Sequence, residues 1–355
     1  MMAAQERTAD TDVLVALQAG VPIERRPFAA LGAQLGMSED AMLGRLRVAF
    51  DEGIARRFGA VFDARRLGYR STLCALELEP AELDGVAARI VPLEGVTHCY
   101  LRGWPAELDG DGPGGPHGAL APNLWFTYTE LADAFDDGLA RVRDLAAPHA
   151  LLVLPAARRF KIDVVLGPGQ RDRMESFPGR ARRAAVDDGG DEPFRAFTET
   201  EKRVVRDMQG AIPPGPAPFD AIAARNGYEA DAFIALLRGW EGEGVLRRVA
   251  LILRHYNAGF KANAMCVWRV DAERVVAAGR ALAACPEVTH CYERVIAPGF
   301  PYNIYAMIHT AGWAETRALF ESIEARAGLA DGRMLCSLRE YKKTSPSYFA
   351  AGTAK

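Results

Sequence analysis

One short motif occurs twice in the sequence, and its residue types are suited to proton transfer and carboxylate binding. VTHCYLR at Val96–Arg102 returns as VTHCYER at Val288–Arg294. Because alternate side chains of a strand share a face, His290, Tyr292 and Arg294 are expected to project together. Imidazole exchanges protons near neutral pH and can bind iron, and guanidinium binds carboxylates. The motif therefore predicts a surface for an anionic ligand.

Neighbouring strands extend this surface. The first copy offers the equivalent set His98, Tyr100 and Arg102, and the strand PYNIYAMIH of the second copy places Asn303, Tyr305 and His309 on one face. The side chains that we expect to bind the ligand from these strands are His98, Lys261, Asn263, Arg294, Asn303 and Tyr305. A polar interface between two packed sheets would use the same residue types, and the repetition alone does not separate the two interpretations.

The two copies differ in their histidines. His255 aligns with Ala64, and His309 aligns with Thr129. A duplicated scaffold keeps its structural residues in both copies, whereas chemistry can be confined to one of them. The candidate catalytic residues are therefore those of the second copy: His255, His290 and His309, with Tyr292.

Two pairs of adjacent arginines stand at the start of equivalent strands. They are Arg56/Arg57 and Arg247/Arg248. Each guanidinium can bind a carboxylate through two hydrogen bonds. Since adjacent strand residues point to opposite faces, only one member of each pair can face the ligand. A solvated strand end is the alternative interpretation.

The repeat predicts an α+β protein with an internal duplication. In each half, short amphipathic helices and a strand indicate a winged helix-turn-helix, with Ser38 as an N-cap and Gly53 at a helix stop. The order strand, helix, strand, strand, helix, strand then indicates a ferredoxin-like domain. The predicted boundaries are 1–65 and 193–256 for the winged helix-turn-helix domains, 66–165 and 257–355 for the ferredoxin-like domains, and 166–192 for a linker rich in Gly, Arg and Asp.

Composition limits the class of protein. Of the 355 residues, 49% are hydrophobic and 25% charged, which is typical of a globular protein, and the net charge of −3 gives no general attraction to nucleic acid or anionic lipid. No apolar run reaches the roughly 20 residues that span a bilayer, and no secretory signal is present, so we expect a cytoplasmic protein. The six cysteines form no C-x-x-C pair and are expected to be reduced core thiols.

A winged helix-turn-helix followed by a ferredoxin-like domain is also the layout of Lrp/AsnC-type transcription regulators. However, the helix expected to enter the major groove is net acidic in both halves. In the second half, Glu229, Asp231, Glu241 and Glu243 stand against Arg238 alone. Such a helix would be repelled by phosphates, so specific DNA binding is not expected.

Long segments of both halves resemble the two related subunits of siroheme decarboxylase. They are RRFGAVFDARRLGYRSTLCALEL, VTHCYLR and PNLWFTYT in the first half, and RRVALILRHYNAGFKANAMCVW, VTHCYERV, PYNIYAMIH and LREYKKTS in the second. The resemblance implies an Lrp/AsnC-like fold in which the halves pair as the subunits do. It also implies an enzyme that removes CO2 from the C12 and C18 acetates of siroheme, giving 12,18-didecarboxysiroheme on a route to haem d1 or haem.

The resemblance also implies a histidine-dependent pocket, within which we assign individual roles. His255 and His290 would donate the proton and orient the substrate, either one contacting the substrate iron, with His309 or Tyr292 in support. Arg247, Arg248 and Lys261 would hold carboxylates that are not cleaved. Because Ala64 replaces a histidine, the first-half pocket is expected to be structural or vestigial. No cofactor beyond the iron tetrapyrrole and no protein-bound metal are expected, and a non-catalytic haem sensor is an alternative.

Overall fold

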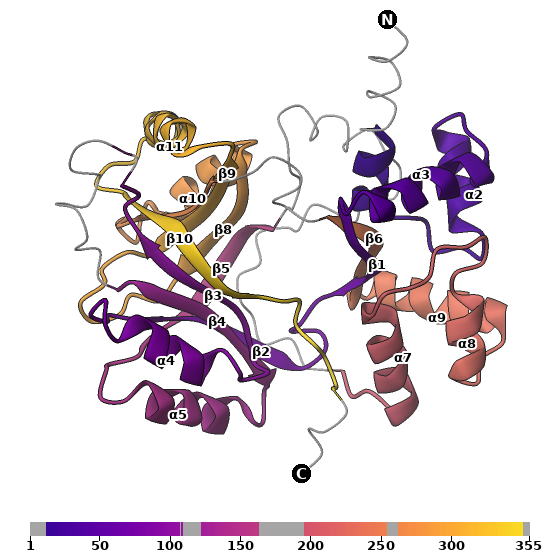
Figure 1. The fold of residues 1–355 in the computed structure, drawn as a ribbon, viewed down its shortest axis with the longest axis horizontal. Helices are drawn as coiled ribbons and strands as arrows, with labels where there is room; N and C mark the ends of the chain where they lie inside the picture. The colour runs from indigo at the N-terminus through magenta and orange to yellow at the C-terminus, as the bar shows by residue number, and fades with distance from the viewer. Residues whose placement is uncertain (1–11, 107, 109–121, 163–194, 254–261, 351–355) are drawn as a thin grey trace, which may run out of the picture.

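The protein has two layers, a helical layer and a β-barrel, and each is built from both halves of the sequence (Figure 1). The computed structural model describes residues 12–106, 108, 122–162, 195–253 and 262–350. The proposed linker at 166–192 lies outside these residues. Within them, no helix combines the length and the apolar character needed to cross a bilayer.

Within the described residues, six short helices and two strands make up the helical layer. The first half contributes a helix at residues 12–19, α2 (Pro27–Gln34), α3 (Glu39–Asp51) and β1 (Ala55–Phe62). The second contributes α7 (Glu199–Gln209), α8 (Asp220–Arg225), α9 (Ala230–Gly242) and β6 (Leu246–Leu253). The predicted cap is confirmed, because Ser38 Oγ accepts a hydrogen bond from the Ala41 amide at 3.2 Å. Gly53 adopts a φ of 69°, as a helix stop requires.

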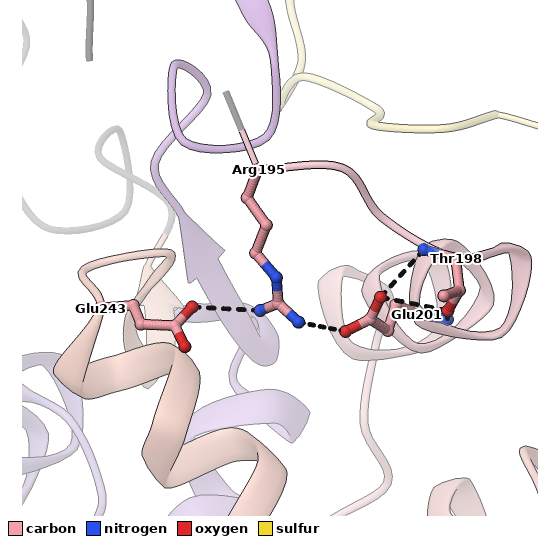
Figure 2. A network of polar contacts seen from close by, with 4 residues as sticks. All are labelled: Arg195, Thr198, Glu201 and Glu243. Carbon is pink, nitrogen blue, oxygen red and sulfur yellow. Dashed lines mark hydrogen bonds and ion pairs between the residues drawn. The ribbon is translucent and has the colours of Figure 1, made fainter. Parts of the chain in front are cut away.

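The second-half helices begin with a stronger cap (Figure 2). Thr198 and Glu201 form a capping box at the start of α7. Arg195 pairs with Glu201 and, at 3.1 Å, with Glu243, which follows α9. This network ties the first turn of α7 to the end of α9, so we assign it to folding.

The strands β1 and β6 pair with each other across the two halves. Their antiparallel register runs from Ala55 opposite Leu253 to Phe62 opposite Leu246. Large side chains from both halves, among them Phe28, Phe58 and Trp240, are buried in one common core. The two helix-turn-helix regions thus fold as one layer, and the predicted wing strand becomes the seam between them.

Eight strands close the barrel. Its order is β10-β3-β4-β2-β5-β8-β9-β7. The first half supplies β2 (Tyr69–Leu76), β3 (Val96–Gly103), β4 (Leu124–Leu131) and β5 (Leu152–Ile162). The second half supplies β7 (Ala262–Trp268), β8 (Val288–Arg294), β9 (Ile304–Thr310) and β10 (Arg333–Lys343).

Two long strands join the halves. The first part of β5 pairs with β2, and its second part, from Ala156 to Ile162, pairs with β8 of the other half. Likewise β10 pairs first with β7 and then, from Cys336 to Lys343, with β3. Each ferredoxin-like sheet therefore completes the edges of its neighbour.

Helices cover the outside of the barrel. The first-half sheet is covered by α4 (Leu83–Ile90) and α5 (Phe135–Ala146), and the second-half sheet by α10 (Val275–Ala284) and α11 (Trp313–Ala327). A separate apolar cluster lies between the two sheets and includes Trp125, Phe300 and Leu335. The prediction for the cysteines is confirmed, since all six are free thiols and buried.

We expect Gly279→Ala to destabilise the fold, because this α10 glycine lies directly under a first-half ring. A Cβ at position 279 would overlap the ring of Phe160 from β5. Overpacking a core typically costs about 1–3 kcal/mol. Urea denaturation should show this loss, whereas Gly239→Ala in α9, where a Cβ meets nothing within 4 Å, should not destabilise. Equal midpoints for the two variants would contradict the cross-half contact.

Candidate active site

The predicted histidines that the structure describes, His98, His290 and His309, lie at the barrel end that faces the helical layer. Tyr69, the first residue of β2, contacts Tyr348 with ring centroids 5.0 Å apart, and Tyr348 belongs to the core of the helical layer. In the antiparallel pairing, the start of β2 lies next to the end of β4, and the end of β4 lies next to the start of β3. His98 is at this start of β3, opposite Thr127 of β4 and Lys343 of β10. We call this end of the barrel the inner mouth.

His290 and His309 of the second half lie at the same mouth. Arg159 of β5, opposite Tyr292 of β8, is 3.6 Å from Asp63 at the end of β1. His290 is two residues before Tyr292 on β8, so the two side chains are on the same face. His309, near the end of β9, lies opposite Asn263, near the start of β7. The structure thus brings His98, His290 and His309 to one end of the barrel.

The alternation of the two H-C-Y-x-R strands is as predicted. Cys99 and Cys291 belong to the cores beneath the covering helices. His98 and His290 therefore project to the opposite face, into the barrel. Since three strands separate β3 from β8 in either direction around the barrel, these two strands face each other across it.

Each motif forms the same ladder of side chains. In the second half, His290 Nδ1 is 3.0 Å from Thr289 Oγ1, and its ring is 6.4 Å from that of Tyr292. Arg294 follows, with its guanidinium 5.0 Å from the Tyr292 ring and 5.5 Å from the Tyr305 ring. Such distances allow cation–π attraction. The ladder orients the imidazole at the mouth and buries the guanidinium deeper in the barrel.

In the first half the ladder holds a neutral imidazole. Burial, and then the charges of Lys343, His290, Arg102 and Arg56, lower the pKa of His98 to about 4. An ordinary histidine titrates near pH 6.5. His98 is therefore uncharged at neutral pH and is not a proton donor there.

We expect His98 to make folding stability depend on pH. Between about pH 6.5 and the lowered pKa of about 4, the unfolded chain binds a proton that the folded chain does not bind. The free energy of unfolding should therefore fall as the pH falls through this range. Urea midpoints at pH 7 and pH 5 should differ more for the wild type than for His98→Gln. An identical pH dependence in the two proteins would contradict the lowered pKa.

Only one arginine of each adjacent pair faces the barrel. Arg247 pairs with Asp63, and the charge of Arg56 acts on His98 and Lys343. Arg57 instead donates from Nη1 to the Gln209 carbonyl at 2.7 Å, within the helical layer. The Cβ of Arg248 packs against Gly20, where an added Cβ would lie 3.2 Å away. We therefore keep Arg247 and Arg56 as ligand-binding candidates and leave out Arg57 and Arg248.

Asn303 serves the backbone. Its Nδ2 donates to the Val270 carbonyl at 2.8 Å, and its Oδ1 accepts from the Val270 amide at 2.9 Å. Asn123 binds Leu78 in the same way in the first half. Because both polar atoms of Asn303 are occupied, we assign it to folding and remove it from the ligand-binding set.

Several barrel groups do keep unused polar atoms. Among the described residues, the buried atoms Asn263 Oδ1, Tyr305 Oη and Arg294 Nε have no hydrogen-bond partner. Arg294 also donates from Nη1 to the Leu154 carbonyl at 2.7 Å. Buried polar atoms are normally paired, so these three are available to a ligand or to water. His255 and Lys261 lie outside the described residues.

Three charged residues at the inner mouth were not predicted from the sequence. They are Asp63, Arg159 and Lys343. Arg159 and Lys343 belong to the second parts of β5 and β10, where the alternation of apolar residues is lost. The run of basic residues at Arg158 and Arg159 was the available signal.

No metal centre is evident in the part of the chain that the structure describes. No three His, Cys, Asp or Glu side chains there are grouped so that they could hold an ion. The inner mouth instead combines imidazoles with guanidiniums. Chemically, such a set can bind carboxylates and move a proton.

Family comparisons agree with this description of the fold. The profile of the AsnC-like ligand binding domain matches residues 66–161 and 257–342, so this is a duplicated AsnC-like protein. The profile described as siroheme decarboxylase NirDL-like HTH domain matches residues 10–56. The first match covers both halves of the barrel, and the second covers the first-half helices.

The chain belongs to the siroheme decarboxylase family. It is 31% identical over 341 residues to the siroheme decarboxylase of Hydrogenobacter thermophilus, covering 95% of this chain and 94% of that protein. The NirDL subunit of Paracoccus denitrificans is 33% identical, over 93% of this chain and 91% of its own. The beta subunit of Oleidesulfovibrio alaskensis is 36% identical over 156 residues, or 44% of this chain and 99% of that subunit.

Solved structures give the same result. The crystal structure of the siroheme decarboxylase NirDL matches with a TM-score of 0.71 and 28% identity, covering 96% of this chain and 94% of that one. NirDL in complex with an iron-uroporphyrin III analogue matches with a TM-score of 0.69 and 27% identity, over the same shares. The predicted fold is confirmed.

Proposed function

We propose that this protein removes CO2 from the C12 and C18 acetate groups of siroheme and releases 12,18-didecarboxysiroheme. The proposal rests on family membership together with one observation, the inner mouth of the barrel. His290 and His309 share that end of the barrel with Arg159, Arg247 and Lys343. Siroheme carries eight carboxylates, so a site that combines cations with imidazoles suits it.

Substrate binding is assigned to the cations and aromatic rings of the mouth. Arg247 and Arg56 reach it from the β1–β6 seam, and Arg294 lies deeper, against Tyr292 and Tyr305. Guanidiniums would hold carboxylates that are not cleaved, and the tyrosine rings would contact the macrocycle. Lys261, outside the described residues, remains a candidate on the strength of the sequence.

The chemical step needs a proton donor. Breaking the bond between the acetate methylene and the carboxylate releases CO2 and leaves an electron pair on the methylene carbon, which the macrocycle delocalises. A protonated histidine then transfers its proton to that carbon, forming a methyl group, and is reprotonated from solvent. We assign this role to His290 and His255, with His309 or Tyr292 in support. His98 of the first half is neutral at pH 7, so it is not assigned as the proton donor.

No further cofactor is needed in this proposal, since the substrate supplies both the iron and the electron sink. Either His255 or His290 would be the side chain that contacts the iron. Each decarboxylation consumes one proton and releases one CO2, so the two steps together need two protons and no external electrons.

The alternative of DNA binding has weak support from the structure. The only basic residue of α9, Arg238, donates from Nε to the Ile23 carbonyl of the first half at 2.9 Å. That cation is therefore engaged within the helical layer. A non-catalytic sensor would bind the tetrapyrrole at the same site but would not convert it, so only a turnover assay separates it from the enzyme.

Anaerobic incubation with siroheme tests the proposal. Mass spectrometry should show two successive losses of CO2 from the tetrapyrrole. A bound-tetrapyrrole absorption spectrum with unchanged ligand mass would identify a sensor. A gel shift of duplex DNA at physiological salt, with no effect on siroheme, would identify a regulator.

A further inference from the structure

Asp63 is a first-half residue buried beside second-half residues of the candidate active site. It directly follows β1 and is 9% exposed. Its amide donates to the Val245 carbonyl at 2.9 Å, and its Oδ1 accepts from the Arg65 amide at 3.0 Å. These contacts fix the carboxylate at the junction between the helical layer and the barrel.

The second carboxylate oxygen of Asp63, Oδ2, lies close to two guanidinium groups. Oδ2 is paired with Arg247 of β6 and lies 3.6 Å from Arg159 Nη2 of β5. Burial alone would raise the pKa of Asp63, but Arg247 and Arg159 hold it below its usual range. The carboxylate is thus ionised, and one negative charge is shared between two positive ones.

The three charges border the groups assigned to catalysis. Arg159 stands opposite Tyr292 in the β5–β8 register, and the charges of both Arg159 and Arg247 act on the Tyr292 hydroxyl. Tyr292 is in turn the neighbour of His290 in the ladder. The cluster thus contains one negative and two positive side chains, and both positive ones act on Tyr292.

The equivalent position on the first-half side has the opposite charge. In the β10–β3 register, Glu340 stands opposite Tyr100, as Arg159 stands opposite Tyr292, and Glu340 hydrogen-bonds that tyrosine. In the sequence alignment of the halves, Arg254 takes the place of Asp63. Among the described residues, the arrangement of two guanidiniums on one carboxylate is found at Asp63 and not at Glu340.

We infer that Asp63, Arg159 and Arg247 form a carboxylate-binding subsite assembled from both halves of the chain. Arg159 and Arg247 hold one carboxylate of the substrate beside His290. Asp63 does not touch substrate; it is a positioning residue that fixes the two guanidiniums. The inference rests on the proposed function for the identity of the substrate, and its chemistry requires a polycarboxylate.

Two substitutions with opposite expected effects on binding test this subsite. Asp63→Asn removes the fixing charge and leaves both cations, so affinity for an iron-uroporphyrin probe should stay the same or increase. The rate of CO2 release at saturating siroheme should fall about tenfold or more, because the reactive acetate is displaced. Arg159→Met keeps the Asp63–Arg247 pair but removes a ligand, so probe affinity should fall about tenfold.

Matched controls separate positioning from damage. Asp84→Asn removes an exposed carboxylate that binds Arg339 and Tyr341, at 2.7 Å each, on the outer surface, and it should change neither rate nor affinity. Asp63→Glu should recover part of the rate lost in Asp63→Asn. Thermal melting reports whether each variant is folded.

The outcomes are distinct. Weaker probe binding in Asp63→Asn, in parallel with a lower melting temperature, would reduce Asp63 to a structural residue and overturn its positioning role. Wild-type probe affinity in Arg159→Met would overturn the subsite, and this variant decides the question if Asp63→Asn does not fold. If the wild type binds the probe but leaves siroheme intact, the proposed function fails, while the contrast in binding still tests the subsite.

Discussion

Replacing His290 by alanine is expected to lower the rate of CO2 release from siroheme about 10²–10⁴-fold, the usual contribution of a general acid. His290 lies at the inner mouth, is hydrogen-bonded through Nδ1 to Thr289, and neighbours Tyr292, on which the charges of Arg159 and Arg247 act. Its other nitrogen would carry the proton that the methylene carbon accepts. The substitution leaves the carboxylate-binding arginines in place, so substrate affinity should change much less than the rate.

Single-turnover assays with siroheme and mass spectrometry measure this effect. His98→Ala is the matched control, because His98 occupies the same rung of the first-half ladder and is neutral at pH 7. It should lower the rate less than His290→Ala does, because a neutral imidazole cannot act as the general acid. His255→Ala, in a segment that the structure does not describe, should resemble His290→Ala. Full activity in both His255→Ala and His290→Ala would refute the histidine mechanism.

Separating the two halves is expected to abolish the fold of each half as a monomer. A half that is produced alone lacks the partner of its long strand, which is β8 for β5 and β3 for β10. Separation also divides the common core of the helical layer, to which both halves contribute. Unpaired strand edges favour association or aggregation. When produced together, the halves should assemble one to one and recover siroheme decarboxylation.

Size-exclusion chromatography with light scattering, together with thermal melting, tests this expectation. The relatives made of separate subunits, such as the Oleidesulfovibrio alaskensis beta subunit, match less than half of this chain. A monomeric first half with a cooperative melt would show that the barrel is dispensable for folding.

Local patterns predicted much of the fold. Helix periodicity, the Ser38 cap and the Gly53 stop located α3, and the period-two alternation of H-C-Y-x-R identified the barrel-facing side of β3 and β8. These features depend on residues close together in the chain. They also placed His98 and His290 on one kind of surface before any contact was known.

Contacts between the two halves could not be predicted from such local patterns. The second parts of β5 and β10 contain RRFKI and REYKK, in which bulges and charges break the alternation that predicts a strand. Asp63 follows a strand in the first half and acts on residues of the second, so no local spacing reveals it. Asn303 shows the converse error, because a polar residue on a polar face proved to bind the backbone of its own half.

Closure of the barrel by strands from both halves has a consequence for how such a protein evolves. In two identical subunits, Arg159 and Glu340 could not occupy equivalent positions, because each substitution would appear on both sides of the symmetry axis. A covalent tether keeps the partners at an effective concentration in the millimolar range and in fixed proportion. Each side of the lumen can then acquire charges of its own, so one side can specialise in chemistry while the other maintains the architecture.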